Sequence, residues 1–172
     1  MKWQVSSILT LTFLFAAATA AAKTPPLTAC ELLSAQAVKG VQGQAFDEAK
    51  LTMQRVDGMI ASQCFYRLPT FTDSISLTVI RAASPSVTAE ELWEKLRGEE
   101  EGEKEEEEEA APAQKIAGVG EEAFWAGNNA AGALYVLEDN AILRISVGGG
   151  DTQKKKIEKA RRLAALALQN LE

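Results

Sequence analysis

The alternation of side chains in residues 74–82 constrains the fold most. Ile75, Leu77 and Val79 share one face of an extended chain, whereas the serine and threonine residues between them point to the other face. One apolar face and one polar face are typical of an antiparallel sheet that is covered on one side. Similar patterns between turn residues predict about six strands, at residues 51–56, 62–68, 74–82, 121–126, 132–138 and 141–147.

Capping boxes mark where helices begin. In this motif a threonine hydroxyl and a glutamate carboxylate satisfy the free amides at the start of a helix. Thr28 with Glu31 forms one such pair, and Thr88 with Glu91 forms another. The predicted helices cover residues 29–39, residues 89–97 and a long C-terminal stretch that begins after Asp151 or Thr152.

The chain also contains short internal similarities. Residues 28–33 read Thr-Ala-Cys-Glu-Leu-Leu, and residues 88–93 read Thr-Ala-Glu-Glu-Leu-Trp. A Gly-Val pair followed by Ala-Phe occurs in residues 40–46 and again in residues 118–124. Matches this short also arise by chance. The simplest fold for this order is an α+β domain of two half-repeats, helix-three strands-helix-three strands-helix, with the helices packed on one face of an antiparallel sheet.

Residues 1–22 have the three parts of a secretory signal peptide. Lys2 provides the positive start, residues 5–18 form an apolar core, and small residues follow. The apolar core is shorter than the roughly 20 residues that a membrane-spanning helix needs, although an uncleaved anchor is the alternative. We expect residues 23–172 to form a single exported domain, periplasmic or secreted, in a bacterium.

Acidic residues are concentrated in one segment. Residues 99–109 hold nine glutamates and one lysine and contribute −8 to a net charge of −6, which leaves the rest of the chain at +2. The segment is therefore predicted to be a low-complexity insertion between the half-repeats, and a solvated loop is the simplest interpretation. The chain has no basic surface broad enough to predict nucleic-acid binding.

Histidine is absent from the whole chain. This excludes Ser-His-Asp and Cys-His catalysis and any zinc or copper site that depends on imidazole. We predict that the protein is not an enzyme and has no cofactor or metal. The alternative is a carboxylate-dependent enzyme that uses Glu121 and Glu122, although neighbouring residues on a strand point to opposite faces.

Two cysteines, Cys30 and Cys64, are the only thiols. In an exported chain they predict a disulfide that joins the first helix to the sheet. Residues 27–30, Leu-Thr-Ala-Cys, also match a bacterial lipobox, in which the cysteine carries a lipid anchor. A lipobox follows the apolar core directly, whereas residues 23–26 intervene here, so the disulfide is the favoured prediction.

Several side chains are candidates for ligand binding. Gly148 to Gly150 precede a helix start with lysines in its first turn, a combination that provides free amides and positive charge for an anion. Large aromatic side chains line many pockets, and arginine recognises carboxylates. The simpler interpretation is that the tryptophans belong to the core and that the arginines lie on the wet side of the sheet. The candidates are Arg67, Trp93, Trp125, Arg144, Lys154 and Lys155.

The chain resembles a group of known proteins in four segments. These are the Cys-x-Leu-Leu opening at Cys30, a second cysteine on a strand, Gly-Val-Gly-Glu-Glu-Ala-Phe-Trp at residues 118–125, and the hairpin of residues 134–147. It is similar to uncharacterised small exported bacterial proteins and, more distantly, resembles the extracellular sensor domains of bacterial serine/threonine kinases. That sensor group has a second disulfide, which this chain lacks.

The resemblance implies a domain that binds or senses an envelope protein or a small ligand. No ligand or catalytic residue carries over from it. The alternatives are the carboxylate-dependent enzyme and a structural module that interacts through the acidic insertion.

Overall fold

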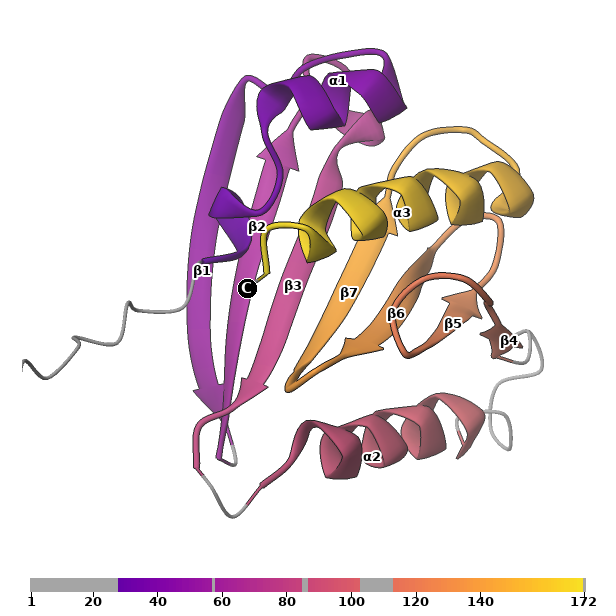
Figure 1. Cartoon of the computed structure of the whole chain (residues 1–172). Helices are drawn as coiled ribbons and strands as arrows, with labels where there is room; N and C mark the ends of the chain where they lie inside the picture. The colour runs from indigo at the N-terminus through magenta and orange to yellow at the C-terminus, as the bar shows by residue number, and fades with distance from the viewer. Residues whose placement is uncertain (1–27, 57, 85–86, 103–112, 172) are drawn as a thin grey trace, which may run out of the picture.

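A single antiparallel sheet forms the centre of the protein (Figure 1). The computed structural model describes residues 28–56, 58–84, 87–102 and 113–171, so the predicted signal peptide and most of the acidic insertion lie outside it. In the described residues the sheet has seven strands, in the spatial order β1-β2-β3-β7-β6-β5-β4. The strands are β1 (Glu48–Val56), β2 (Met59–Arg67), β3 (Ile75–Ala82), β4 (Gln114–Lys115), β5 (Glu122–Gly127), β6 (Gly132–Glu138) and β7 (Ala141–Val147).

Two three-stranded meanders meet at the middle of this sheet. β1, β2 and β3 follow one another in space as in sequence, and so do β5, β6 and β7. The meanders join where β3 pairs with β7, from Ile75 opposite Val147 to Arg81 opposite Ala141. The six predicted strands are therefore present. β4 was not predicted, because two polar residues carry no periodic signal.

The first helix differs from the prediction. Instead of one helix over residues 29–39, a 3-10 turn, η1 (Ala29–Glu31), precedes a separate helix, α1 (Ala35–Gln42). The break has a local cause, because the Ser34 hydroxyl accepts a hydrogen bond from the Ala37 amide and starts a new helix. The remaining helical elements are η2 (Phe71–Asp73), α2 (Ala89–Gly102) and α3 (Gln153–Leu168).

The helices cover both faces of the sheet, so the prediction of helices on one face is wrong. η1, α1 and α3 pack on one face over the larger core, which includes Leu77, Val136 and Leu143. α2 packs on the other face over β6 and β7, where Phe124 and Ile142 contact Leu92 and Trp93 in a second core (Figure 1). β5, β6 and β7 are nearly continuous apolar runs, which are typical of strands buried on both faces.

Both predicted capping boxes are present. The Glu31 carboxylate accepts hydrogen bonds from the Thr28 amide and hydroxyl, which hold the pKa of Glu31 below its usual value. Thr88 and Glu91 exchange two hydrogen bonds at the start of α2. The two similar segments nevertheless occupy different places, because η1 lies on the α1 face of the sheet and α2 lies on the opposite face.

The last helix buries one stripe of mostly small side chains. Ala160, Leu163, Ala164 and Ala167 are fully buried against the sheet, which lets the helix approach the strands closely. None of the helices within the described residues is both long enough and apolar enough to cross a membrane.

Candidate binding face

The predicted disulfide is confirmed. Cys30 and Cys64 are bonded, which joins η1 to the second strand of the sheet. Two hydrogen bonds support the same junction: the Ala29 amide donates to the Ser62 hydroxyl at 3.0 Å, and the Tyr66 hydroxyl donates to the Ala29 carbonyl at 2.7 Å. Burial raises the pKa of Tyr66 well above its usual range. The junction is therefore a buried structural element.

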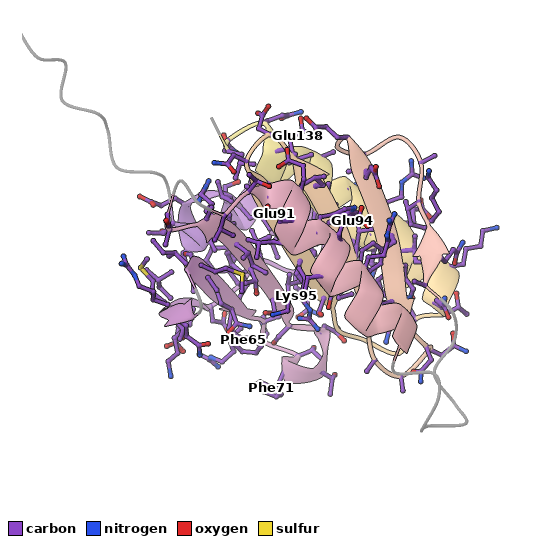
Figure 2. The ribbon with its side chains drawn as sticks, turned by 90° about the horizontal axis from the view of Figure 1, so that it is seen from below. Phe65, Phe71, Glu91, Glu94, Lys95 and Glu138 are labelled. Carbon is purple, nitrogen blue, oxygen red and sulfur yellow. A yellow bond between two sulfur atoms is a disulfide. The ribbon has the colours of Figure 1, made fainter. Side chains whose placement is uncertain are left out.

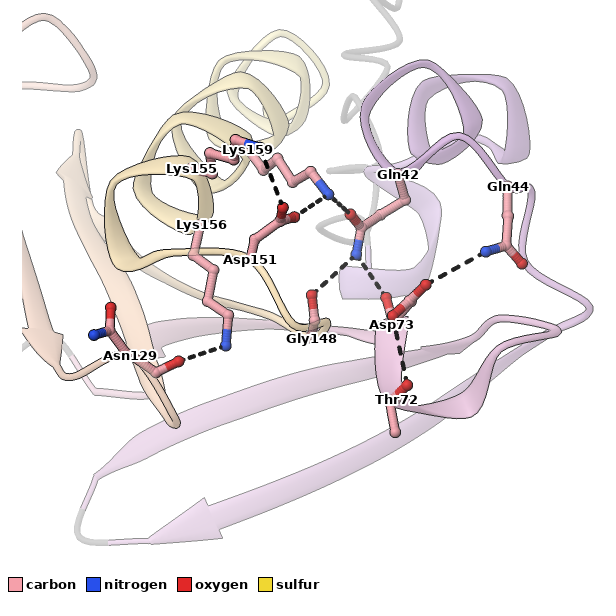
Figure 3. A network of polar contacts seen from close by, with 10 residues as sticks. All are labelled: Gln42, Gln44, Thr72, Asp73, Asn129, Gly148, Asp151, Lys155, Lys156 and Lys159. Atoms are coloured by element: carbon pink, nitrogen blue, oxygen red, sulfur yellow. Dashed lines mark hydrogen bonds and ion pairs between the residues drawn. The ribbon is translucent and has the colours of Figure 1, made fainter.

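The lysines after the triple glycine contact the protein itself (Figure 3). Lys156 is buried and donates to the carbonyls of Asn129 and Ala130 in the turn between β5 and β6. Asp151 binds Lys159 at 2.6 Å and lies 4.0 Å from Lys155. Lys155 is therefore partly neutralised.

The same network extends to other elements. The hydrogen bond from Lys159 holds the pKa of Asp151 below its usual value. Lys159 also donates to Gln42, whose amide nitrogen donates to the Asp73 carbonyl at 2.6 Å (Figure 3). Helices α1 and α3 are thereby linked to η2. Lys156 and Lys159 thus connect α3 to the turn between β5 and β6 and to α1, whereas the predicted candidates Lys154 and Lys155 stay at the start of α3.

The two candidate tryptophans lie on opposite faces of the sheet. Trp125 belongs to the core under α3, and Trp93 belongs to the core under α2. Trp125 is 1% exposed, and its indole N–H has no hydrogen-bond acceptor among the described residues. The two side chains cannot line one pocket.

An aromatic row leads from α2 to Arg144. The Trp93 ring lies 5.0 Å from the Phe124 ring, which stacks on Tyr135 at 4.8 Å between ring centroids. Arg144 donates through Nε to the Tyr135 hydroxyl at 2.9 Å, and its guanidinium lies 5.6 Å from the centre of that ring. Stacking and the hydrogen bond hold Arg144 in a fixed position at the border of the region that α2 covers.

Beyond Arg144, none of the described helices covers the same side of the sheet. Directly opposite residues in an antiparallel sheet share a face, and Arg144 is opposite Thr78, which is opposite Gln63. Thr52 of β1 completes this row. The residues of this region are half-buried or exposed. We call it the open face: Lys50, Thr52, Gln63, Phe65, Arg67, Phe71, Ser76, Thr78 and Arg144.

The open face combines polar, cationic and aromatic groups. Phe65 and Phe71 have ring centroids 5.9 Å apart, and Phe71 is 66% exposed (Figure 2). Arg67 pairs with Glu48 at 3.1 Å, and both side chains are about half exposed. The described structure thus brings Arg67 and Arg144 onto one face, as the wet-side interpretation expects, while Lys154 and Lys155 lie at the start of α3.

Cavities occur elsewhere in the described structure. One of about 170 Å³ lies between α2 and β5, where Glu122 accepts a hydrogen bond from Trp93 and lies 3.8 Å from Arg97. Another of about 390 Å³ lies beside Lys154 and Gln114. Two more lie near Arg81 and Ala82, and none of these four is lined by a residue of β1 or β2. Within the described residues, no three Cys, Asp or Glu side chains are grouped closely enough to hold a metal ion.

Phe65 and Phe71 were not singled out from the sequence. Phe65 alternates with buried residues of β2, and Phe71 follows Pro69 in a turn, where a large apolar residue is unusual. The place of Phe71 in the sequence is a usable signal, because an aromatic residue in a polar turn buries little of its surface on folding.

The fold and its surfaces define an α+β domain with a seven-stranded antiparallel sheet, three α-helices packed against it and one disulfide among the described residues. Comparison of the chain with protein families, with curated proteins and with solved structures gives no match.

Proposed function

We propose that this protein is an exported domain that binds another protein through its open face. The observation that carries the proposal is the row Thr52, Gln63, Thr78 and Arg144, which no helix of the described residues covers although α2 covers the neighbouring half of the same face. Hydrogen-bonding side chains on the surface of a sheet, beside the aromatic pair Phe65 and Phe71, suit a macromolecular surface better than a small molecule, which is bound in a concave site.

The charge of the open face indicates the chemistry of the partner. Lys50 and Arg144 bring positive charge without a carboxylate opposite them in the sheet, whereas Arg67 is paired with Glu48. Arginine that is already oriented by Tyr135 loses little freedom when it binds a carboxylate. We therefore propose a protein partner with exposed acidic groups next to an apolar patch.

Two sequence observations support a binding role in the cell envelope. Residues 1–22 predict export, and the resemblance to sensor domains implies recognition rather than catalysis. The carboxylates considered for an enzyme do not support the alternative as well, since Glu122 is engaged by Trp93 and Arg97 of α2. The two meanders also support the proposal that the chain consists of two half-repeats, of which only the strands have kept equivalent places.

Site-specific photocrosslinking tests this proposal. Phe71 is replaced by a photoreactive phenylalanine analogue in the full chain, produced in its native cells. Ala165, which is exposed on α3 on the opposite side of the sheet, carries the same analogue as the control. We expect a discrete adduct with another protein from position 71 and no such adduct from position 165.

Charge variants make the test specific. Lys50→Glu and Arg144→Glu are each combined with the label at position 71, and thermal melting shows whether they fold. We expect each reversal to reduce the adduct by about ten-fold, which corresponds to the loss of one charge-assisted contact. Adducts that are equal at positions 71 and 165, or that are unaffected by both charge reversals, contradict the proposal.

A further inference from the structure

Among the described residues, the sheet has one long unpaired edge and one short one. β1 (Glu48–Val56) spans nine residues at one edge, whereas β4 (Gln114–Lys115) spans two at the other. A long edge strand offers a row of backbone amides and carbonyls to another strand, and proteins usually shorten or cover such an edge. In the described residues the β4 edge is shortened in this way, and the β1 edge is not.

Exposed apolar side chains are concentrated on that long edge. Among the described residues, the large apolar side chains with high exposure are Leu51 (41%), Met53 (57%) and Phe71 (66%). Leu51 and Met53 lie on β1 and alternate with Thr52, so both point to the α1 face of the sheet. The edge therefore combines unpaired backbone with an apolar pair on one side.

The sequence of β1 is complementary to itself. If two copies of β1 pair antiparallel about a two-fold axis through Thr52, Leu51 lies opposite the second copy's Met53, and Met53 lies opposite its Leu51. Thr52 meets Thr52, and Lys50 meets the uncharged Gln54. This register places no two like charges opposite each other, which is the arrangement that would destabilise an antiparallel pair.

Neighbouring registers are less favourable. A slip of one residue would put the α1 face of one copy on the same side as the open face of the other, because successive side chains of a strand point to alternate faces. If the two-fold axis passes through Met53 instead, Leu51 lies opposite Arg55. If it passes through Leu51, Met53 lies opposite Ala49. Only the axis through Thr52 pairs both exposed apolar side chains with each other.

We propose that a second copy of this chain pairs with β1 and forms a two-fold symmetric dimer with one continuous sheet. The two-fold axis is perpendicular to the sheet, so the open faces of both copies lie on the same side and adjoin at Lys50 and Thr52. Because each copy uses its own β1 and the β4 edge is short, the assembly closes as a dimer and does not extend into a fibre. The inference rests on the edge strand and not on the identity of any partner of the open face.

Cysteine cross-linking tests the dimer and its register. Both native cysteines are in the disulfide, so Thr52→Cys introduces a single free thiol into the chain. We expect this variant of the full chain to form a covalent dimer under mild oxidation, because the two residues face each other across the axis. In Lys50→Cys, the two thiols are displaced by four residues, roughly 13 Å along the strands, which is too far for a disulfide.

Rates of disulfide cross-linking and sedimentation equilibrium decide the outcome. We expect Thr52→Cys to cross-link at least about ten-fold faster than Lys50→Cys, since only the former can reach disulfide geometry. The double variant Lys50→Cys/Gln54→Cys is expected to cross-link, because those positions are opposite each other. In sedimentation equilibrium the wild type is expected to show a concentration-dependent doubling of mass. Met53→Lys is expected to raise the dissociation constant by about ten-fold, because the altered pair occurs twice.

The inference is overturned if the wild type is monomeric at all concentrations, or if Thr52→Cys and Lys50→Cys cross-link at the same rate. Its failure is distinguishable from failure of the proposed function. Photoadducts from Phe71 to a different protein can persist when the chain is monomeric, in which case only the edge pairing is refuted. A dimer without any such adduct refutes the proposed function alone.

Discussion

Breaking the bond between Cys30 and Cys64 should reduce the stability of the domain by a predictable amount. The two cysteines are separated by 34 residues. In the chain-entropy model, a cross-link that closes a loop of this length restricts the unfolded chain and stabilises the folded one by about 4 kcal/mol. A domain of this size has a total stability of roughly 5–15 kcal/mol, so the loss is a large fraction of the whole.

The native contacts around the bond indicate where the loss arises. Ala29 is held by its hydrogen bonds to Ser62 and Tyr66 whether or not the sulfurs are joined. Cys64 is fully buried, so alanine is a better replacement than serine, whose hydroxyl would need a buried partner. We therefore expect η1 to keep its place in the reduced protein and the effect to come mainly from the unfolded chain.

Urea unfolding of the oxidised wild type, the reduced wild type and Cys30→Ala/Cys64→Ala measures this. With a denaturant dependence of roughly 2 kcal/mol per molar urea, the midpoint should fall by roughly 2 M on reduction. The double variant should have nearly the same midpoint as the reduced wild type and should not respond to reductant. A midpoint shift below about 0.5 M would contradict this prediction, because the unfolded loop would then be restricted by other means.

Two further predictions concern the α3 network and the glycine before it. Lys159 lowers the pKa of Asp151 in the folded protein from its ordinary 3.8, so the folded carboxylate stays charged at lower pH than the unfolded one. This stabilisation is present above pH about 4 and is lost as the pH falls through the folded pKa. The difference in urea midpoint between wild type and Asp151→Asn should therefore be constant from about pH 7 to 5 and shrink below about pH 4. Equal differences at about pH 3 and pH 7 would contradict this prediction. Gly148→Ala should destabilise by about 1–3 kcal/mol in urea unfolding, because its Cβ would overlap the Thr72 carbonyl oxygen and lie 2.8 Å from that of Ser74. The matched control Gly40→Ala, with nothing within 4 Å in helix α1, should stabilise by about 0.5–1 kcal/mol, and equal effects of the two changes would show that the contact is unimportant.

The strands were predictable because their information is local. In β3 the alternation of Ile75, Leu77 and Val79 with hydroxyl residues defines both the strand and its buried face. The turn at residues 138–140 is likewise encoded locally, and Asp139 adopts the positive φ of 48° that short polar residues tolerate. The disulfide was predictable from chemistry, since two cysteines leave a single intramolecular pairing.

The arrangement of the helices was not predictable by the same means. An apolar stripe shows that α2 needs a surface to cover, but it does not say which face of the sheet provides it. The information lies in β6, where Ala133, Tyr135 and Leu137 are buried on the face opposite Leu134 and Val136. A strand with apolar side chains on both faces needs cover on both faces. β6 therefore indicates a helix on each face, whereas the prediction of one covered face followed the alternation in β3.

The candidate site was predictable only in part. Arg67 and Arg144 were recognised as exposed on the sheet, but their common face follows from the pairing of β3 with β7, which no local pattern encodes. Lys154 and Lys155 were chosen as anion-binding candidates because lysines follow the triple glycine in the sequence. In the structure Asp151 lies 4.0 Å from Lys155, and the next lysine, Lys156, binds the Asn129 carbonyl because the turn between β5 and β6 folds back against α3.

The junction of β3 and β7 has a consequence for how the protein reaches its native state. Each meander grows through hairpins between consecutive strands, whereas β3 and β7 are separated by the whole chain from Ala83 to Asn140. Closing so long a loop is entropically unfavourable, so this central pairing is expected to form late in folding. Until then two apolar strands have open edges in the middle of the future sheet, and the hydrogen bond from Gln42 to the Gly148 carbonyl forms only once that gap has closed. During synthesis, the protein is therefore most prone to aggregation at its centre, the part that is best protected once folding is complete.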